Sequence, residues 1–550
     1  MPLLALALAA LALPASASAA GLDEAGYWRL ADATQQRLDP IWDEHAGMYR
    51  PGGSGTDPAV NAGLLLTHAV AAQRGHEGPA RNDHRARLIA ARLTRRGGPF
   101  VDRGQAPPGV QHHAPGWVSS MDSPSHADQH LVYDAEVVDG LAAAWRARCA
   151  LDLPASTVAA IEDRIGRTVA GRFWRYLAIR LNQINWYGLM YAASATVNGR
   201  DTLLRHDLAL QIRRFMRDIH GRGASAGNLG PGARFHYLPQ ASVASRMNVD
   251  SAEYANIVIS VTRFLDQGRA AGMRVSSADL ARMRVWARRV IAGYWTHGGY
   301  LNWDTGFGFE RWHQAKKLGL SAQALIGLAS SDTLGLEPRW RARAKEMLDN
   351  GLRFYERQSL RAGGAPPALF FGVHKVPQTP ASARLGAARM ESNAARAIAA
   401  GLGRARSSTP PSLYAYDPDT GRLAVTTRAY NTAVMAVNQG AFPYGGLELA
   451  RLYDFRQEVA GNVGGLPAAS FGLVADRGAR RILATQHPRR LPGRTPPLRL
   501  THAPSGVGAS AAHSAAGRAY AGPFRAITAT GTTSGGCCPP ASRTASRRAR

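Results

Sequence analysis

Two short stretches of this chain hold the residue types that sugar chemistry uses. The first runs from Asn182 to Tyr191 and the second from Gly232 to Pro239. They combine aromatic rings with amides in the first stretch and with a histidine in the second, between segments that have helical periodicity. An aromatic ring can stack on a pyranose while amide and imidazole groups reach its hydroxyls and carboxylate. The two stretches therefore predict a concave site for a sugar.

The first stretch places Asn185, Trp186 and Tyr187 after a predicted long helix. In a functional interpretation, Asn185 donates hydrogen bonds to a sugar carboxylate while Trp186 and Tyr187 offer ring surface. In a structural interpretation, Asn185 ends the helix and Trp186 belongs to the core. Both interpretations remain open at the level of sequence.

The second stretch places Arg234, His236 and Tyr237 after a loop that contains glycine. Histidine can remove a proton near neutral pH, and tyrosine can donate or accept one. Tyr254 is a second candidate hydroxyl. The structural alternatives are a hydrogen-bonded loop histidine with a packed Tyr237, and a surface position for Tyr254.

A third cluster combines two tryptophans, Trp303 and Trp312, with the carboxylates Asp304 and Glu310. Two carboxylates beside aromatic rings could be the acid and base of glycoside hydrolysis, with the rings and Glu310 binding sugar. The alternative is that Glu310 joins an ion pair between helices.

Metal and cofactor sites are not predicted. His126, Asp128 and His130 have metal-ligand spacing, but no further ligand is evident and a preceding Ser-Pro-Ser favours a loop or a helix start. No phosphate-binding or dinucleotide-binding glycine motif is present. Residues 130–145, which include three acidic residues, predict a helix with an acidic face.

Residues 22–403 predict an array of antiparallel helical hairpins, about thirty residues per hairpin. Apolar residues recur at helical spacing, and Gly, Pro, Asn and Asp separate the segments. The most regular predicted helices span residues 156–181, 201–220, 277–294, 321–328 and 338–358. The fold class predicted from this pattern is mainly α, and the family resemblance described below implies that the hairpins form an (α/α) toroid.

Residues 412–486 predict an antiparallel β domain, which we expect to be incomplete because it is short for two packed sheets. Residues 487–550 predict a disordered basic tail, or a segment read out of frame in a GC-rich gene. From Arg477 onward there are thirteen Arg and no Lys, Asp or Glu, which accounts for thirteen of the net charge of +27. Charge is therefore weak support for nucleic-acid binding, and we expect no such partner.

The N-terminus predicts export. Residues 1–20 are apolar and end in small residues around Ala17 and Ala19, as in a signal peptide. No later segment supplies about 18 uninterrupted apolar residues, so we expect a secreted protein without a membrane partner after processing.

These features together resemble the α/α-toroid polysaccharide lyases, in particular the chondroitin AC/hyaluronate lyase group and, more distantly, the heparinase II/III-like group. In the first group an Asn beside aromatics is followed by a His and then a Tyr. Here Asn185 and Trp186, then His236, then Tyr254 follow the same order. The wider separation of His236 and Tyr254, with Tyr237 adjacent to the histidine, leaves the identity of the tyrosine open.

The resemblance implies β-elimination on an acidic polysaccharide that contains uronic acid, with no cofactor. Asn185 and Arg234 would neutralise the carboxylate, His236 or a tyrosine would remove the C5 proton, and Tyr237 or Tyr254 would protonate the departing oxygen. Two other functions remain open. One is a glycoside hydrolase that uses Asp304 and Glu310, and the other is an exported glycan-binding protein without catalysis.

Overall fold

The computed structural model describes most of residues 21–408 and short strands after them. The described residues are 21–50, 57–95, 98–101, 115–117, 131–171, 183–218, 252–295, 298–299, 315–361, 380–408, 413–417, 422–426, 430–435, 448–454, 459–462, 474–477, 480–484, 498–500, 524–527 and 533–536. The predicted signal peptide, residues 1–20, lies outside this part of the chain.

The helices are arranged as two concentric layers. The inner helices are α2 (Asp57–Arg74), α4 (Leu131–Arg146), α6 (Gln183–Asn198), α9 (Ala252–Ile259) continued by η5 (Ser260–Phe264), α12 (Ala315–Ser330) and α14 (Pro380–Ala399). The outer elements are α1 (Glu24–Leu38), α3 (Asp83–Thr94), α5 (Ala155–Ala170), η4 (Leu203–Leu208) with α7 (Ala209–Asp218), α11 (Ser277–Tyr294) and α13 (Pro338–Arg361). Short segments η1 (Asp39–Ile41), α10 (Leu265–Ala270) and η7 (Leu402–Arg404) complete the helical part.

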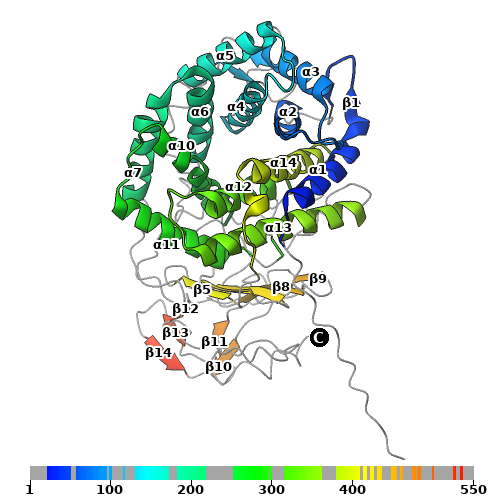
Figure 1. Cartoon of the computed structure of the whole chain (residues 1–550). Helices are drawn as coiled ribbons and strands as arrows, with labels where there is room; N and C mark the ends of the chain where they lie inside the picture. The colour runs from blue at the N-terminus through cyan, green and yellow to red at the C-terminus, as the bar shows by residue number, and fades with distance from the viewer. Residues whose placement is uncertain are drawn as a thin grey trace, which may run out of the picture.

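The inner helices form a closed ring. Each packs against its neighbours in the order α2, α4, α6, α9 with η5, α12, α14 and back to α2. The outer helices lie against this ring, α1 on α14, α3 on α2, α5 between α4 and α6, and α13 on α12 (Figure 1). The predicted toroid of helical hairpins is therefore confirmed by the packing of the described helices.

The inner helices run in the same direction. Along α14 and α2, Ala388 lies against Gly63, and ten residues later Ile398 O accepts a hydrogen bond from Arg74. Along α6, Asn185 meets Arg263, and then Ala192 meets Gln267. Parallel inner helices give the ring two different ends, an N-terminal mouth and a C-terminal mouth.

The two mouths differ in the chain segments that reach them. Connections from an inner to an outer helix are short turns, such as residues 75–82, where Gly75 has φ of 66°. That left-handed conformation suits glycine, which has no Cβ to clash. Connections from an outer to an inner helix are longer, up to the 36 residues of 95–130 between α3 and α4. The long connections therefore all lead into the N-terminal mouth.

The predicted helices agree with the observed ones because local signals define their ends. The predicted segment 277–294 is α11, whose N-cap Ser276 accepts a hydrogen bond from Asp279 N at 3.0 Å. Asn82 caps α3 in the same way through Arg85 N. Such side-chain oxygens satisfy amide groups that have no partner inside the helix. The predicted helix 156–181 corresponds to α5, and its last ten residues lie outside the described part.

A buried ion pair within α13 forms hydrogen bonds to the first outer helix and to the residue just before it. Lys345 Nζ lies 2.6 Å from Asp349 Oδ2, and it also donates to Leu22 O. Asp349 accepts hydrogen bonds from Leu22 N and from the Tyr27 hydroxyl. Burial raises the pKa of Asp349, while the Lys345 ammonium opposes that rise. The contacts close the outer layer between its sequence-distant members α1 and α13.

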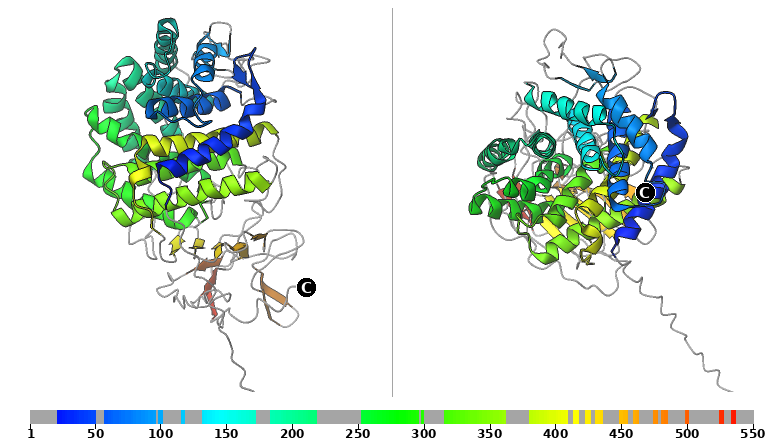
Figure 2. Two further views of the ribbon diagram at one scale, coloured as in Figure 1. Left: turned by 45° about the vertical axis from the view of Figure 1, so that its right-hand side comes forward. Right: turned by 45° about the horizontal axis from the view of Figure 1, so that its top comes forward.

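Short strands occur beside and after the helices. Two hairpins, β1 (Trp42–Asp43) with β2 (Met48–Tyr49) and β3 (Phe100–Val101) with β4 (Gly116–Trp117), flank α2 to α4. A five-stranded antiparallel sheet follows in the order β5 (Leu413–Asp417), β6 (Arg422–Thr426), β7 (Tyr430–Met435), β8 (Glu448–Asp454) and β9 (Val459–Asn462). Its strands β5 and β6 contact α11, so the sheet lies beneath the helical ring (Figure 2).

The remaining described strands form two small antiparallel sheets. They are the pair β10 (Val474–Arg477) and β11 (Arg480–Ala484), and the sheet of β12 (Leu498–Leu500), β13 (Phe524–Ile527) and β14 (Thr533–Gly536). The predicted change from helices to antiparallel strands near residue 412 is confirmed. Most of residues 487–550 lie outside the described part, so the disorder and dispensability expected for them remain predictions. No helix among the described residues is long and apolar enough to cross a membrane.

Candidate functional site

Most of the residues predicted from sequence lie in the long connections to the N-terminal mouth. Arg234, His236 and Tyr237 precede α9, and the residues Trp303, Asp304, Glu310 and Trp312 precede α12. All of these lie outside the described residues. Tyr254 is the third residue of α9, and its side chain is likewise outside the described part.

The first predicted stretch forms the N-terminal half of an inner helix instead of following the end of one. Helix α6 begins at Gln183, and Asn185 and Trp186 are each 1% exposed. Tyr187 is buried as well. The functional interpretation, in which Asn185 contacts a sugar carboxylate and Trp186 stacks on a sugar, needs exposed side chains, and the burial of both residues contradicts it. An inner helix is covered on all sides by its neighbours, so its polar and aromatic residues are buried together.

Asn185 keeps a polar partner inside the ring. Its Oδ1 accepts a hydrogen bond of 3.1 Å from Arg263 Nη2, which comes from the adjacent element η5. Trp186 differs, because its indole nitrogen is buried and has no hydrogen-bond partner in the described structure. Asn185 thus belongs to a polar arrangement in the ring, whereas Trp186 packs in the core and offers no open face to a sugar.

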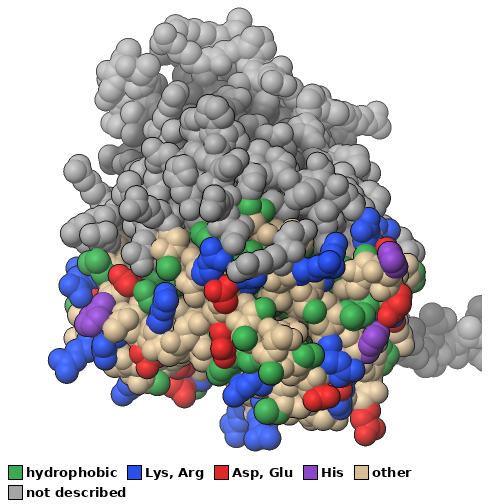
Figure 3. All heavy atoms as spheres, turned by 90° about the horizontal axis from the view of Figure 1, so that it is seen from above, with side chains coloured by type: hydrophobic (Ala, Val, Ile, Leu, Met, Phe, Trp, Pro, Cys, Tyr) green, Lys and Arg blue, Asp and Glu red, His purple; other side chains and the backbone are tan. Residues whose placement is uncertain are grey.

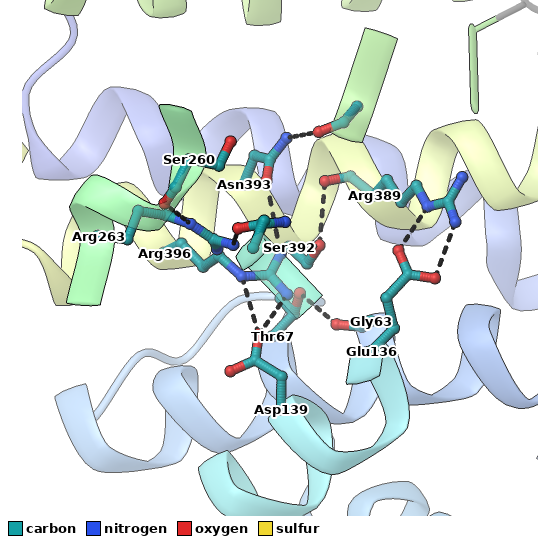
Figure 4. Close-up of polar contacts among 12 residues, drawn as sticks. Gly63, Thr67, Glu136, Asp139, Ser260, Arg263, Arg389, Ser392, Asn393 and Arg396 are labelled. Atoms are coloured by element: carbon teal, nitrogen blue, oxygen red, sulfur yellow. Dashed lines mark hydrogen bonds and ion pairs between the residues drawn. The ribbon is translucent and has the colours of Figure 1, made fainter. Parts of the chain in front are cut away.

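The ring interior holds a group of charged side chains that sequence patterns did not indicate. We call it the interior cluster; it consists of Glu136, Asp139, Arg263, Arg389 and Arg396 (Figure 4). These residues come from α4, η5 and α14, which are not neighbours in the ring. Side chains from alternate helices can meet only inside the ring, so the cluster occupies its centre.

The most deeply buried pair in the cluster is Glu136 with Arg389. Arg389 Nε and Nη2 donate to the two carboxylate oxygens at 2.7 and 2.8 Å, and both side chains are about 5% exposed. Two parallel hydrogen bonds fix the planar guanidinium against the carboxylate. In this bidentate pair both groups already have a charged partner, so neither is suited to proton transfer.

The second pair is closer to solvent. Arg396 donates to Asp139 Oδ2 at 2.7 and 3.2 Å, and both side chains retain some exposure. Burial acts to raise the pKa of Asp139, but the guanidinium groups of Arg396 and Arg263 outweigh it and hold the pKa below its ordinary value. Asp139 is therefore ionised near neutral pH and cannot serve as a general acid.

Arg263 is the cation of the cluster without an ion-pair partner among the described residues. Its hydrogen bonds to described residues go to neutral acceptors, Asn185 Oδ1 and Ser260 O. Burial, with repulsion from Arg396, lowers the pKa of Arg263 to about 9. The group is still charged at pH 7, so the ring contains a cation with unused capacity for an anion.

A cavity of about 190 Å³ opens beside this cation. The residues that line it come from the C-terminal halves of inner helices and from η5. They are Leu66, Val70, Asp139, Arg146, Arg263, Ile326, Ser330, Arg396, Ala399 and Ala400. The cavity therefore belongs to the C-terminal mouth, opposite the mouth reached by the predicted site residues.

A second buried polar group lies between the inner and outer layers. This outer cluster consists of Gln35, Asp39, Tyr49, His68, Arg85 and Glu391. The Tyr49 hydroxyl accepts hydrogen bonds from Gln35 and Arg85 and lies 3.2 Å from His68 Nε2. His68 Nδ1 is 2.8 Å from Ala80 O, so the neutral ring donates to that carbonyl and accepts from Tyr49.

Glu391 is the exception in the outer cluster. It is 1% exposed, and neither carboxylate oxygen has a hydrogen-bond partner in the described structure. The nearby Thr67 hydroxyl lies 3.3 Å from Gly63 O and donates to it. Burial, assisted by the carboxylates of Asp39 and Asp32, raises the pKa of Glu391 well above its usual range.

The prediction for residues 130–145 needs correction. The segment is a helix, α4, but its acidic residues do not form a solvated face. Asp134 is fully buried and accepts from Trp117 N at 2.7 Å, while Glu136 and Asp139 bind arginines of α14. Glu136 and Asp139 serve as counterions for arginines that come from a distant part of the chain and meet them inside the ring.

The described residues on the face drawn in Figure 3 do not form a basic stripe. In Figure 3, basic and acidic side chains are interspersed over the described part of the face in view. A duplex-binding surface would gather Lys and Arg along one stripe. Among the described residues, no group of three potential metal ligands is found.

Comparison with known proteins identifies no family. The sequence matches no family model and no curated protein. The structure is similar to a glycosyl hydrolase family 88 protein from Bacteroides vulgatus, with 10% identity and a TM-score of 0.44, over 69% of this chain and 99% of that one. It is also similar to cellobiose 2-epimerase from Bacillus thermoamylovorans B4167, with 10% identity and a TM-score of 0.39, over 59% of this chain and 86% of that one. The packing of the inner helices, and not these likenesses, establishes the ring.

Proposed function

We propose that this chain is an exported carbohydrate-active enzyme that cleaves an acidic polysaccharide by β-elimination at the N-terminal mouth of the ring. The observation that carries the proposal is the parallel inner ring, which gathers all long connections at one mouth. The motifs that sequence patterns single out lie in those connections or in the inner helices they precede. Motif residues that are far apart in the sequence thus lie in segments that lead to the same end of the ring.

Electrostatics favours an anionic substrate at this mouth. Each inner helix carries a partial positive charge at its N-terminus, and parallel helices add these charges at the same end. Arg234 in the connection before α9 adds a full positive charge. A uronic-acid polymer carries the complementary charge along its length.

The proposed reaction needs a base, an acid and a group that neutralises the carboxylate. His236 removes the C5 proton, the C4–O bond breaks as the C4–C5 double bond forms, and Tyr237 or Tyr254 protonates the departing oxygen. Arg234 is the candidate for direct contact with the carboxylate. The buried Asn185, bonded to Arg263, is assigned a positioning role instead of the direct contact expected from sequence.

The two carboxylates of the interior cluster are poorly suited to hydrolysis. Hydrolysis requires a carboxylic acid that gives up its proton to the leaving group. Glu136 and Asp139 are both bound to arginine, and the pKa of Asp139 is lowered. A hydrolase would therefore depend on Asp304 and Glu310 in the connection before α12.

The test is incubation of the full chain with a panel of acidic polysaccharides, with ultraviolet absorbance and reducing ends measured together. Elimination produces both signals, because each cut creates a double bond conjugated to a carboxylate. New reducing ends without absorbance would overturn elimination and favour hydrolysis by Asp304 and Glu310. Binding without either product would indicate a glycan-binding protein.

Variants then assign the roles. His236→Ala should abolish the absorbance signal, while His84→Ala, at an exposed histidine on α3, should leave it unchanged. Asn185→Ala should lower kcat per folded molecule. Asn256→Ala is the matched control, because this buried asparagine accepts from Trp295 instead of facing Arg263. Loss of melting temperature with unchanged kcat in both asparagine variants would contradict the positioning role.

A further inference from the structure

The cavity at the C-terminal mouth has the composition of a binding site. It measures about 190 Å³, several times the roughly 30 Å³ that one water molecule occupies in the liquid. Sites for drug-sized ligands begin at about 300 Å³, so this cavity fits a small molecule and not a polymer segment. It lies at the mouth opposite the connections that carry the candidate cleavage residues.

The charge of the lining favours an anion. Arg146, Arg263 and Arg396 face the cavity with a single carboxylate, that of Asp139. Arg396 is bound to Asp139, whereas Arg263 bonds only neutral oxygens among the described residues. The partly buried Arg263 and the exposed Arg146 therefore form no ion pair with a carboxylate in the described structure.

The remaining lining residues suggest what the anion is attached to. Leu66, Val70 and Ile326 form an apolar wall, which suits the carbon face of a small ring. Ser330 Oγ donates to Ile326 O at 2.8 Å, so its oxygen remains as an acceptor for a ligand hydroxyl. Asp139 Oδ1, which makes none of the described arginine bonds, is a second acceptor.

We propose that this cavity binds one hydroxylated carboxylate of monosaccharide size, with Arg263 and Arg146 on the carboxylate and with Ser330 and Asp139 on hydroxyls. A guanidinium matches the two oxygens of a carboxylate in a bidentate arrangement, which explains the preference for arginine. The site is independent of polymer cleavage at the opposite mouth. It would be occupied whether the chain is a lyase, a hydrolase or a binding protein.

Isothermal titration of the full chain with free glucuronic acid tests the proposal, with glucose and acetate as comparison ligands. Glucose lacks the carboxylate and acetate lacks the ring, so both should bind at least tenfold more weakly than glucuronate. Charge-assisted hydrogen bonds contribute roughly 1.5–3 kcal/mol, which corresponds to about tenfold or more in affinity. Equal affinity for glucose and glucuronate, or for acetate and glucuronate, would overturn the assignment.

Two substitutions locate the binding. Arg263→Met should weaken glucuronate binding at least tenfold, and Arg146→Met, at an exposed residue that is easily replaced, should weaken it several-fold. Arg74→Met is the matched control, because Arg74 ends α2 at the same mouth but bonds Ile398 O and does not line the cavity. Melting temperatures without ligand identify any variant that fails to fold. Unchanged binding in Arg146→Met and in a folded Arg263→Met, or equal loss in Arg74→Met, would refute the site.

Discussion

Helix α14 contributes side chains to two buried polar clusters, and its arginines and its glutamate have different partners in them. Arg389 and Arg396 enter the interior cluster, where each meets a carboxylate of α4. Glu391, two residues after Arg389, lies about 200° around the helix and joins the outer cluster. In the interior cluster Glu136 and Asp139 are each paired with an arginine, whereas in the outer cluster burial favours the neutral forms of Glu391 and His68.

The difference teaches that burial alone does not determine ionisation in this protein. A guanidinium that forms two hydrogen bonds to a buried carboxylate favours its charged form, and Arg389 makes such a contact with Glu136. Without such a partner, desolvation dominates and the proton is retained. The two clusters therefore respond differently to neutral substitutions and to pH.

The largest expected effect is on the fully buried pair. Glu136→Gln leaves Arg389 charged in the ring without its counterion, which should lower the free energy of unfolding by roughly 3–5 kcal/mol. Urea denaturation measures the change. The double variant Glu136→Gln with Arg389→Met is the control and should recover part of the loss. A single variant as stable as the parent chain would break the distinction between the two clusters.

The next effect is a dependence of stability on pH through His68. Burial lowers the pKa of His68 from 6.5 to about 4. Between these values the unfolded chain binds a proton that the folded chain does not, so stability falls as pH decreases from about 6.5 to 4. The shift corresponds to about 3 kcal/mol for this group. His68→Gln should remove that part of the slope in denaturation curves, whereas exposed His84→Gln should not.

A smaller effect is expected at the second interior pair. Asp139 and Arg396 keep 18% and 13% side-chain exposure, against about 5% for Glu136 and Arg389. Water can therefore partly solvate Arg396 when its partner is removed, and Asp139→Asn should cost roughly 1–3 kcal/mol. Urea denaturation of Asp139→Asn and Glu136→Gln under the same conditions ranks the two losses of stability. A larger loss for Asp139→Asn would contradict this account of burial.

The smallest effect should have the opposite sign. Because the pKa of Glu391 is raised, the folded chain holds a proton that the unfolded chain releases above the ordinary carboxyl pKa. Its ionisation therefore reduces stability as pH rises through that window. Glu391→Gln should raise the melting temperature, more at pH 8 than at pH 5, while the exposed Glu77→Gln should not. A lower melting temperature at both pH values would show that the carboxyl group is needed.

Local sequence signals by themselves predicted the array of helical hairpins and the bounds of helices such as α11, but not the start of α6. Periodicity and the cap at Ser276 define α11, because helix capping depends only on neighbouring residues. The change from helices to strands near residue 412 has the same local origin, in alternation and β-branched residues. These signals were sufficient for the ring architecture, since short turns force neighbouring helices to pack antiparallel.

Only the tertiary structure decided which polar residues are buried and with what partners. Trp186 has a sequence context typical of a sugar site, yet the closed ring buries it in the core. Arg263, Arg389 and Arg396 gave no signal in a chain rich in arginine, because nothing local distinguishes them from surface residues. Glu136 and Arg389 are 253 positions apart, and only closure of the ring brings them within 2.7 Å. Pairing of buried charges depends on such distant contacts, which helical periodicity does not encode.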